Sequence, residues 1–200
     1  MLASCLLAKP SKISTTGSIF CVLALSWSPT YCASAKQRAS SRKLSLQCSA
    51  RWFAFVVHGL WPHCTQGIPS YCQVPATRVD AKLVNAMLNL MPSRSLILHE
   101  WNRHGTCSGL SAQDDFDTLR KTRAAVTIAA AYLDPVEPQS VSPAEVAAAF
   151  IKANPGLSAG AMAVSCNKMR LTEVRLCPGK DLSFRDCAAI AIGIVDATRS

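Results

Sequence analysis

The stretch that says most about the fold is FVVHGLWP, at residues 55–62. Residues 52–57, which overlap the start of this stretch, are rich in aromatic and β-branched side chains, which favour a buried strand. We expect that strand to end at Gly59. His58 would then be presented at the end of a rigid element.

A second stretch, HEWNRHGTC at residues 99–107, follows an apolar run and contains a glycine at which a helix could stop. On a helix, residues four apart lie on one face. Glu100 and His104 would therefore share one face, and His99 and Arg103 would share an adjacent one. One wall of a site would carry a carboxylate, two imidazoles and a fixed positive charge.

Two histidines on separate elements have the clearest chemical meaning. Displacement at phosphorus needs one group that takes a proton from the attacking hydroxyl and another that gives a proton to the leaving oxygen. Imidazoles can do both near neutral pH. His58 and His104 therefore indicate cleavage of a phosphodiester.

Two other interpretations compete with this one. His-Glu-x-x-His is a zinc-protease signature, but His99 and His104 are five residues apart, about 140° around a helix, and do not share a face as zinc ligands would. In a purely structural interpretation the apolar residues fill the core and the histidines are hydrogen-bonded bystanders. The clustering of several histidines with a carboxylate disfavours that interpretation.

Both stretches closely resemble the signature segments of the T2 family of secreted, acid-type endoribonucleases. Family-like pieces flank them, LALSWSPTYC at residues 23–32 and LTEVRLC at residues 171–177. The resemblance runs from about Phe20 to Cys187. It implies an α+β fold, with a central antiparallel sheet flanked by helices in a disulfide-linked single domain. Helices grouped with strands that lack a repeated βαβ rhythm indicate the same class.

The resemblance also implies roles for individual residues. His58 and His104 would be the acid and base pair, Glu100 and Arg103 would stabilise the charged phosphorane, and His99 would anchor a phosphate. The substrate would be single-stranded RNA, cut by its own 2′-hydroxyl to leave a 2′,3′-cyclic phosphate, with no metal or other cofactor. The alternative is a catalytically silent RNA-binding or interaction protein on the same scaffold, which the complete set of these residues disfavours.

Base recognition is less well defined by the sequence. Trp61 could stack on a base, because stacking on an aromatic ring tolerates every base; it could equally be a core tryptophan. In some relatives an acidic side chain just after the Trp-Pro pair helps to choose the base. Here that place holds His63, which leaves the base preference open.

Composition agrees with one domain that binds a polyanion. The 21 Lys and Arg residues against 12 Asp and Glu residues give a net charge of +9, which favours a partner such as RNA. Half of the 200 residues are hydrophobic, enough for a substantial core, and no apolar run is long enough to cross a membrane. We expect a monomer.

Ten cysteines are more than a cytosolic enzyme normally carries without a metal, and their spacings contain no paired C-x-x-C zinc module. We therefore expect an oxidising compartment and a periplasmic or secreted protein. The resemblance implies three disulfides, Cys32–Cys48, Cys72–Cys107 and Cys177–Cys187. Cys64 and Cys166 are left to pair with each other or stay free, and Cys5 and Cys21 have no expected partners.

Residues 1–18 lack the basic start of a signal peptide and are predicted to be a divergent or truncated leader; residues 19–200 are predicted to be the catalytic domain. Local signals within that domain predict helices at 79–91, 111–131 and 142–154, strands at 161–166, 171–176 and 189–195, and an exposed loop at 36–43.

Overall fold

The structure, a computed structural model, describes residues 20–38, 46–49, 53–63, 68–134, 140–167 and 170–187. Four strands form one antiparallel sheet in the order β2-β1-β4-β3. The strands are β1 (Phe20–Trp27), β2 (Phe55–His63), β3 (Met162–Asn167) and β4 (Arg170–Leu176). The α-helices are α1 (Ser28–Arg38), α2 (Leu46–Ser49), α3 (Ala81–Met87), α4 (Arg94–Arg103), α5 (Ala112–Ala124) and α6 (Pro143–Ala153). This arrangement confirms the predicted α+β class.

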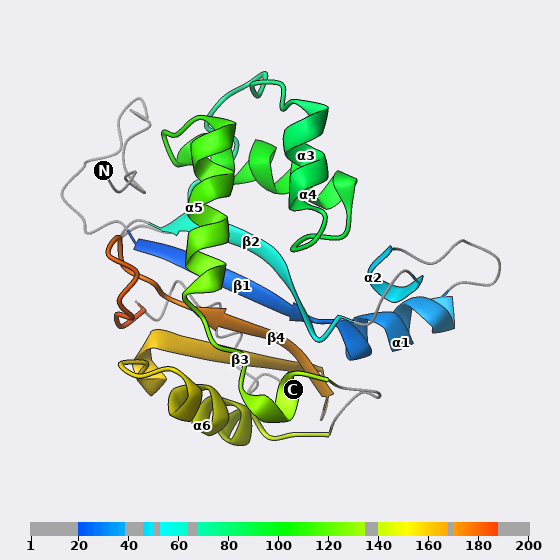
Figure 1. The fold of residues 1–200 in the computed structure, drawn as a ribbon, viewed down its shortest axis with the longest axis vertical. Coiled ribbons are helices and arrows are strands. Elements are labelled where there is room, and N and C mark those ends of the chain that lie inside the picture. The colour runs from blue at the N-terminus through cyan, green and yellow to red at the C-terminus, as the bar shows by residue number, and fades with distance from the viewer. Residues whose placement is uncertain are drawn as a thin grey trace, which may run out of the picture.

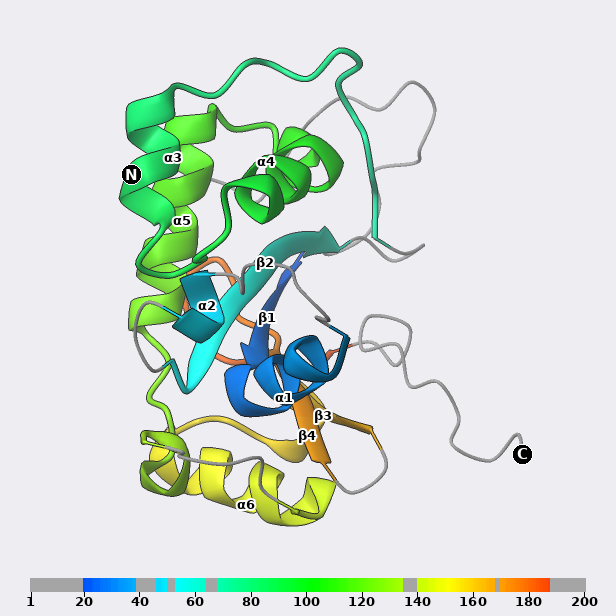
Figure 2. The same cartoon turned by 90° about the vertical axis from the view of Figure 1, so that its right-hand side faces the viewer.

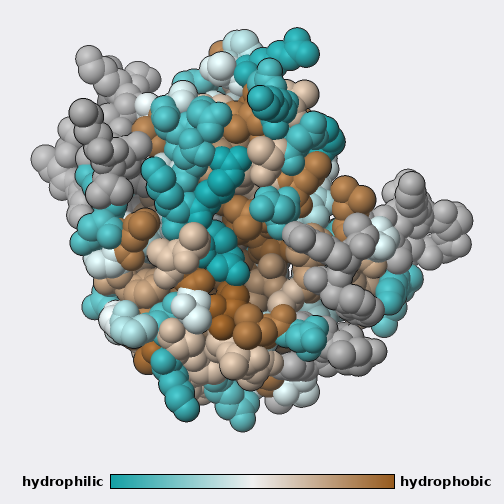
Figure 3. All heavy atoms as spheres, viewed as in Figure 1, coloured by the Kyte–Doolittle hydropathy of each residue, from teal (hydrophilic) through white to brown (hydrophobic). Residues whose placement is uncertain are grey.

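The helices gather around the two edges of the sheet. In Figures 1 and 2, α3 and α4 lie beyond β2, α6 lies beside β3, and α1 continues from the end of β1. α5 runs from the group of helices beyond β2 down across the sheet. On the face that Figure 3 shows, hydrophilic residues gather over α3 and α5, and apolar residues show mainly lower down.

One face of the sheet carries the main hydrophobic core. β1 contributes Leu23, Leu25 and Trp27, all completely buried, because alternate residues of a strand point to the same side. Helices α3 to α6 complete this core with Val84, Met87, Ile97, Trp101, Phe116, Leu119, Val146 and Phe150. The opposite face carries a much smaller apolar cluster of Val22, Ala24, Trp61 and Cys177.

Several predicted elements have different limits in the structure. α3 ends at Met87 and α5 at Ala124, so both helices are shorter than expected, whereas α6 begins at the expected capping box of Ser142 and Glu145. The strand that leads into His58 does not end at the following glycine, because β1 pairs with β2 as far as His63. Of the expected loop at 36–43, residues 36–38 belong to α1. Residues 39–43, the predicted leader at 1–18 and the predicted strand at 189–195 lie outside the described residues.

The three disulfides that the resemblance implies are all present. Cys32–Cys48, Cys72–Cys107 and Cys177–Cys187 have Cα atoms 5.5, 4.9 and 5.7 Å apart. Cys166 is a free thiol, so the suggested pairing of Cys64 with Cys166 is wrong. Cys21 is disulfide-bonded, which corrects the expectation that it has no partner.

Within the part of the chain that the structure describes, no helix is both long enough and apolar enough to span a bilayer.

The Cys72–Cys107 bridge is expected to be a major source of stability. It closes a loop of 35 residues that contains both α3 and α4, and a loop of that length corresponds to about 3–4 kcal/mol. The double variant Cys72→Ser/Cys107→Ser should therefore melt well below the parent. Thermal unfolding, with peptide mapping of the non-reduced protein, is the measurement. Equal melting temperatures for parent and variant would contradict this role.

Candidate functional site

A shift in strand register presents His58. Ala24 of β1 pairs with Gly59 of β2, and the next residue, Leu25, pairs with Val57. His58 is therefore the extra residue of a β-bulge, a feature that redirects side chains and is common beside active sites. Its side chain is 36% exposed, while the residue before it is buried in the main core.

The bulge also decides where Trp61 lies. In a regular strand, residues three apart point to opposite faces. Here the ring centroids of His58 and Trp61 are 5.3 Å apart, on the face that carries the small apolar cluster. Val57 and Leu60 remain in the main core on the other face.

Helix α4 brings the second group of side chains to this face. Ser93 caps its first turn by accepting a hydrogen bond from the Leu96 amide, and His104 follows its last residue. The His104 amide donates to the Glu100 carbonyl at 2.8 Å, so these two residues are one turn apart. Both are buried. The prediction that they share one face of a helix end is confirmed.

Trp61 joins the strand to the helix. Its Nε1 donates to the Glu100 carboxylate at 2.7 Å, and its ring centroid lies 5.5 Å from that of His104. The residue is only 7% exposed. The ring is therefore packed beside both imidazoles, and its role in base binding stays a prediction.

Glu173 is a site residue that the sequence analysis missed. Its Oε2 lies 2.8 Å from His58 Nδ1, although the two residues are 115 positions apart in the chain. Its Oε1 accepts a hydrogen bond from Arg175 Nε at 2.6 Å, and the Arg175 guanidinium lies 5.3 Å from the centre of the Trp61 ring. The available signal was the pair of charged residues at alternate positions of an otherwise apolar strand, LTEVRLC at residues 171–177.

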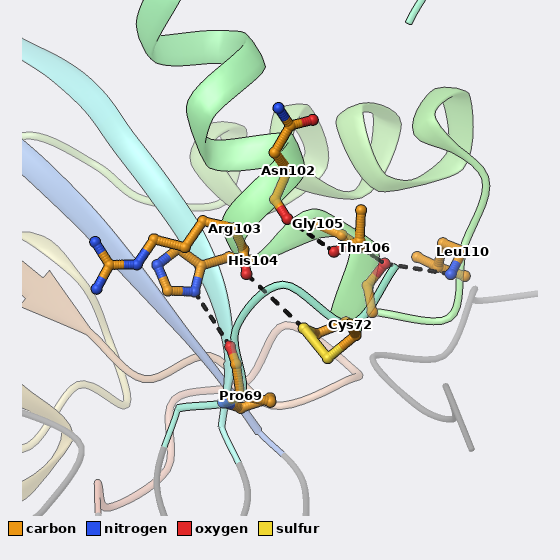
Figure 4. The surroundings of a disulfide bond; sticks show 10 residues. Pro69, Cys72, Asn102, Arg103, His104, Gly105, Thr106 and Leu110 are labelled. Carbon is orange, nitrogen blue, oxygen red and sulfur yellow. Dashed lines mark hydrogen bonds between the residues drawn. A yellow bond between two sulfur atoms is a disulfide. The ribbon is translucent and has the colours of Figure 1, made fainter. Parts of the chain in front are cut away.

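The segment that leads into the Cys72–Cys107 disulfide holds His104. The Pro69 carbonyl lies 3.4 Å from His104 Nδ1, and the Arg103 carbonyl accepts a hydrogen bond from the Tyr71 amide at 2.7 Å. Figure 4 shows the side chains of Arg103 and His104 on the same side, pointing away from the disulfide. The positive charge of Arg103 therefore lies next to the imidazole of His104.

Two other histidines have contrasting positions. His99 is exposed on α4, as is Arg103 one turn later, so both can meet solvent or a ligand. His63, which follows the Trp-Pro pair, is completely buried at the end of β2. Among the described residues, no three His, Cys, Asp or Glu side chains are grouped so as to hold a metal ion.

The two central imidazoles have opposite pKa shifts. Burial lowers the pKa of His58, but the hydrogen bond to Glu173 and the charges of Glu173 and Glu100 outweigh burial, so the net shift is upward. Burial lowers the pKa of His104 to about 4, helped by the charges of Arg103 and His99 and opposed by the Pro69 carbonyl. At mildly acidic pH, His58 is therefore protonated and His104 is neutral.

The carboxylates also differ from each other. Burial raises the pKa of Glu100, although the hydrogen bond from Trp61 and the charge of His58 oppose that shift. Burial acts in the same direction on Glu173, but its contacts with His58 and Arg175 prevail and lower its pKa. Glu173 is therefore the more firmly ionised of the two.

Both imidazoles are tied at Nδ1, which leaves Nε2 for chemistry. His58 Nε2 lies 3.8 Å from Glu100 Oε1, beyond hydrogen-bonding distance. A carbonyl oxygen can only accept, so the proton of neutral His104 lies on Nδ1 and its Nε2 carries a lone pair. The site thus combines a proton donor and a proton acceptor.

Comparison with known proteins identifies clear relatives. The Ribonuclease T2 family matches residues 18–187. A ribonuclease from Aeromonas hydrophila is 47% identical over 97 residues, which cover 48% of this chain and 40% of that protein. Ribonuclease DdI from Dictyostelium discoideum is 30% identical over 151 residues, covering 67% of this chain and 66% of that protein. The chain therefore spans less than half the length of the bacterial relative that it matches.

The fold has solved counterparts. The crystal structure of RNase NT in complex with 5′-AMP aligns with a TM-score of 0.62 and 21% identity, covering 88% of this chain and 98% of that one. At this level of identity the likeness concerns the fold.

Gly59 is predicted to be irreplaceable for activity. A Cβ atom there would lie 2.4 Å from both Glu100 Oε2 and Trp61 Nε1, so Gly59→Ala should displace the carboxylate. A misplacement of about 1 Å can cost about 100-fold in rate, and kcat should fall by about that factor while the protein stays folded. Gly156→Ala is the matched control. A Cβ there would contact no other atom, but the backbone φ of +85° disfavours any residue with a side chain. The control should lose stability and keep its activity; full activity in Gly59→Ala would refute the prediction.

Proposed function

Because the chain belongs to the Ribonuclease T2 family, we propose that it is an endoribonuclease that cleaves single-stranded RNA by 2′-hydroxyl transphosphorylation. The observation that carries the proposal is the pair of imidazoles with opposite pKa shifts, each tied at Nδ1. The protonated His58 and the neutral His104 are the two states that such a reaction requires.

In the proposed reaction, His104 Nε2 takes the proton of a ribose 2′-hydroxyl, whose oxygen attacks the adjacent phosphorus. His58 Nε2 gives a proton to the departing 5′-oxygen. The products are a 2′,3′-cyclic phosphate and a free 5′-hydroxyl. DNA lacks the nucleophile and should not react.

Fixed charges would stabilise the transition state. Arg103 lies beside His104 and His99 is exposed on the same helix, so both can contact phosphoryl oxygens as the negative charge develops. Glu100 is held by the Trp61 indole close to His58 Nε2. Electrostatic preorganisation of this kind is usually the largest contribution to such catalysis. These groups can act without a cofactor.

Tyr71 is a second candidate for base binding beside the predicted Trp61. Trp61 is buried, whereas Tyr71 is 51% exposed, and its amide is bonded to the Arg103 carbonyl at the end of α4. A base stacked on Tyr71 would lie next to the catalytic segment. Single-stranded RNA suits such a platform, because its bases are free to splay out.

The structural disulfides support an oxidising compartment, and hence a periplasmic or secreted protein. We propose that it acts as a monomer on RNA, to which its net charge of +9 attracts it.

The test is incubation of the oxidised protein with single-stranded RNA and with the matching DNA, both in excess chelator. We expect cleavage of RNA alone, with a 2′,3′-cyclic phosphate detected by ³¹P NMR. Binding without cleavage would indicate the silent scaffold, and activity lost on chelation would indicate a metal-dependent hydrolase.

His58→Ala and His104→Ala should each lower turnover by about 10²–10⁴-fold, because each removes one proton-transfer group. Lys82→Ala, which alters an exposed lysine of α3 with no part in the proposed reaction, is the control and should keep parental activity. Circular dichroism checks that each variant is folded. Near-parental turnover in either of the first two variants would remove that residue from its proposed role.

The pH dependence of kcat/KM should be bell-shaped. His104 must lose its proton, so the rate rises as pH increases through about 4. His58 must keep its proton, so the rate falls as pH increases through the pKa of His58, which is raised from its ordinary value of 6.5. The optimum should therefore lie on the acidic side of neutral, with limbs that belong to the coupled pair. Initial rates on a short RNA measure this profile, and a rate that climbs steadily into the alkaline range would contradict it.

A further inference from the structure

The polar side chains beside His58 form a connected group on the sheet. Glu173 accepts from His58 Nδ1 at 2.8 Å and from Arg175 Nε at 2.6 Å. The Arg175 guanidinium lies over the Trp61 ring, and the Trp61 indole donates to Glu100. The contacts thus run from one nitrogen of the imidazole round to the carboxylate that lies nearest its other nitrogen.

We propose that Glu173 is a positioning residue of the reaction: its carboxylate holds the Nδ1–H of His58, so that Nε2 is presented to the leaving oxygen as the proton donor. The inference rests on the proposed ribonuclease function, in which His58 is the general acid.

The chemistry of the contact fixes the state of the imidazole. An ionised carboxylate can only accept hydrogen bonds, so the proton in this contact belongs to His58 Nδ1. Burial raises the pKa of Glu173, but its contacts with His58 and Arg175 outweigh burial and keep it ionised. When His58 gives up a proton, that proton therefore comes from Nε2. Neutral His58 is then the Nδ1–H tautomer.

The sheet is built so that this contact can form. β1 lies between β2 and β4, so the backbones of β2 and β4 are about 10 Å apart. The residues of β1 that pair with Arg175 and Glu173 are Ala24 and Ser26, both small. The Glu173 side chain can therefore pass over β1 to His58.

Glu173 should also set the pH range of the reaction. The titratable and charged groups around His58 are Glu173 and Arg175 from β4, and Glu100 and His104 from α4 and its end. Neutralising Glu173 leaves one carboxylate against the positive charge of Arg175. The pKa of His58 should then fall, which moves the alkaline limb of the rate profile to lower pH.

The experiment compares Glu173→Gln with the parent on two substrates. One is a dinucleotide, whose leaving oxygen needs a proton; the other is a nucleoside 3′-(4-nitrophenyl phosphate), whose leaving group does not. On the dinucleotide, kcat should fall about 10–100-fold with KM little changed. On the nitrophenyl ester the loss should nearly disappear. Glu145→Gln, a carboxylate-to-amide change in the α6 capping box that a glutamine can also form, is the matched control and should keep parental rates.

The outcomes separate the two proposals. If the parent cleaves neither substrate, the ribonuclease function is wrong. If the parent cleaves both and Glu173→Gln keeps the parental pH profile, or loses equal activity on both substrates, the role of Glu173 alone is wrong.

Nitrogen-15 NMR of the parent gives a test that does not depend on the variant folding. Neutral His58 should carry its proton on Nδ1, and a proton found on Nε2 would overturn the inference.

Discussion

The register shift between β1 and β2 is the constraint on which the site depends. In a regular strand His58 and Trp61 would point to opposite faces, because side chains alternate. The extra residue in β2 puts both on the face away from the main core, while Val57 and Leu60 stay within that core. Without the shift, β2 could supply either the core residues or the paired aromatic rings of the site, but not both.

The same face must bury two carboxylates, and the neighbours of the two imidazoles decide which of them is charged. An isolated buried charge is very unfavourable, so each carboxylate is hydrogen-bonded, Glu100 to an indole and Glu173 to an imidazole and a guanidinium. His58 lies against both of them and is stabilised in its charged form. His104 has a backbone carbonyl and positively charged neighbours instead, so its neutral form is favoured. The difference in pKa between the two imidazoles therefore follows from the neighbours of two chemically identical side chains.

Local sequence predicted the parts of the site that local geometry fixes. The one-turn spacing of Glu100 and His104 and the capping box of α6 are properties of a single helix, and the structure confirms both. The bulge at His58 could not be predicted, because it is defined by pairing with β1, about 35 residues earlier in the chain. Glu173 was missed for a similar reason, since only the strand order β2-β1-β4 brings it to His58.

Trp61 has contacts that the sequence alone did not predict. Its ring contacts both imidazoles, with centroids 5.3 and 5.5 Å away, and its N–H is bonded to Glu100. An indole has one donor, and a buried donor needs an acceptor. Rotating the ring outward to meet a base would break that bond and leave the buried carboxylate without its donor. The physical cost of exposing Trp61 therefore falls on Glu100 and on the two imidazoles that the ring contacts.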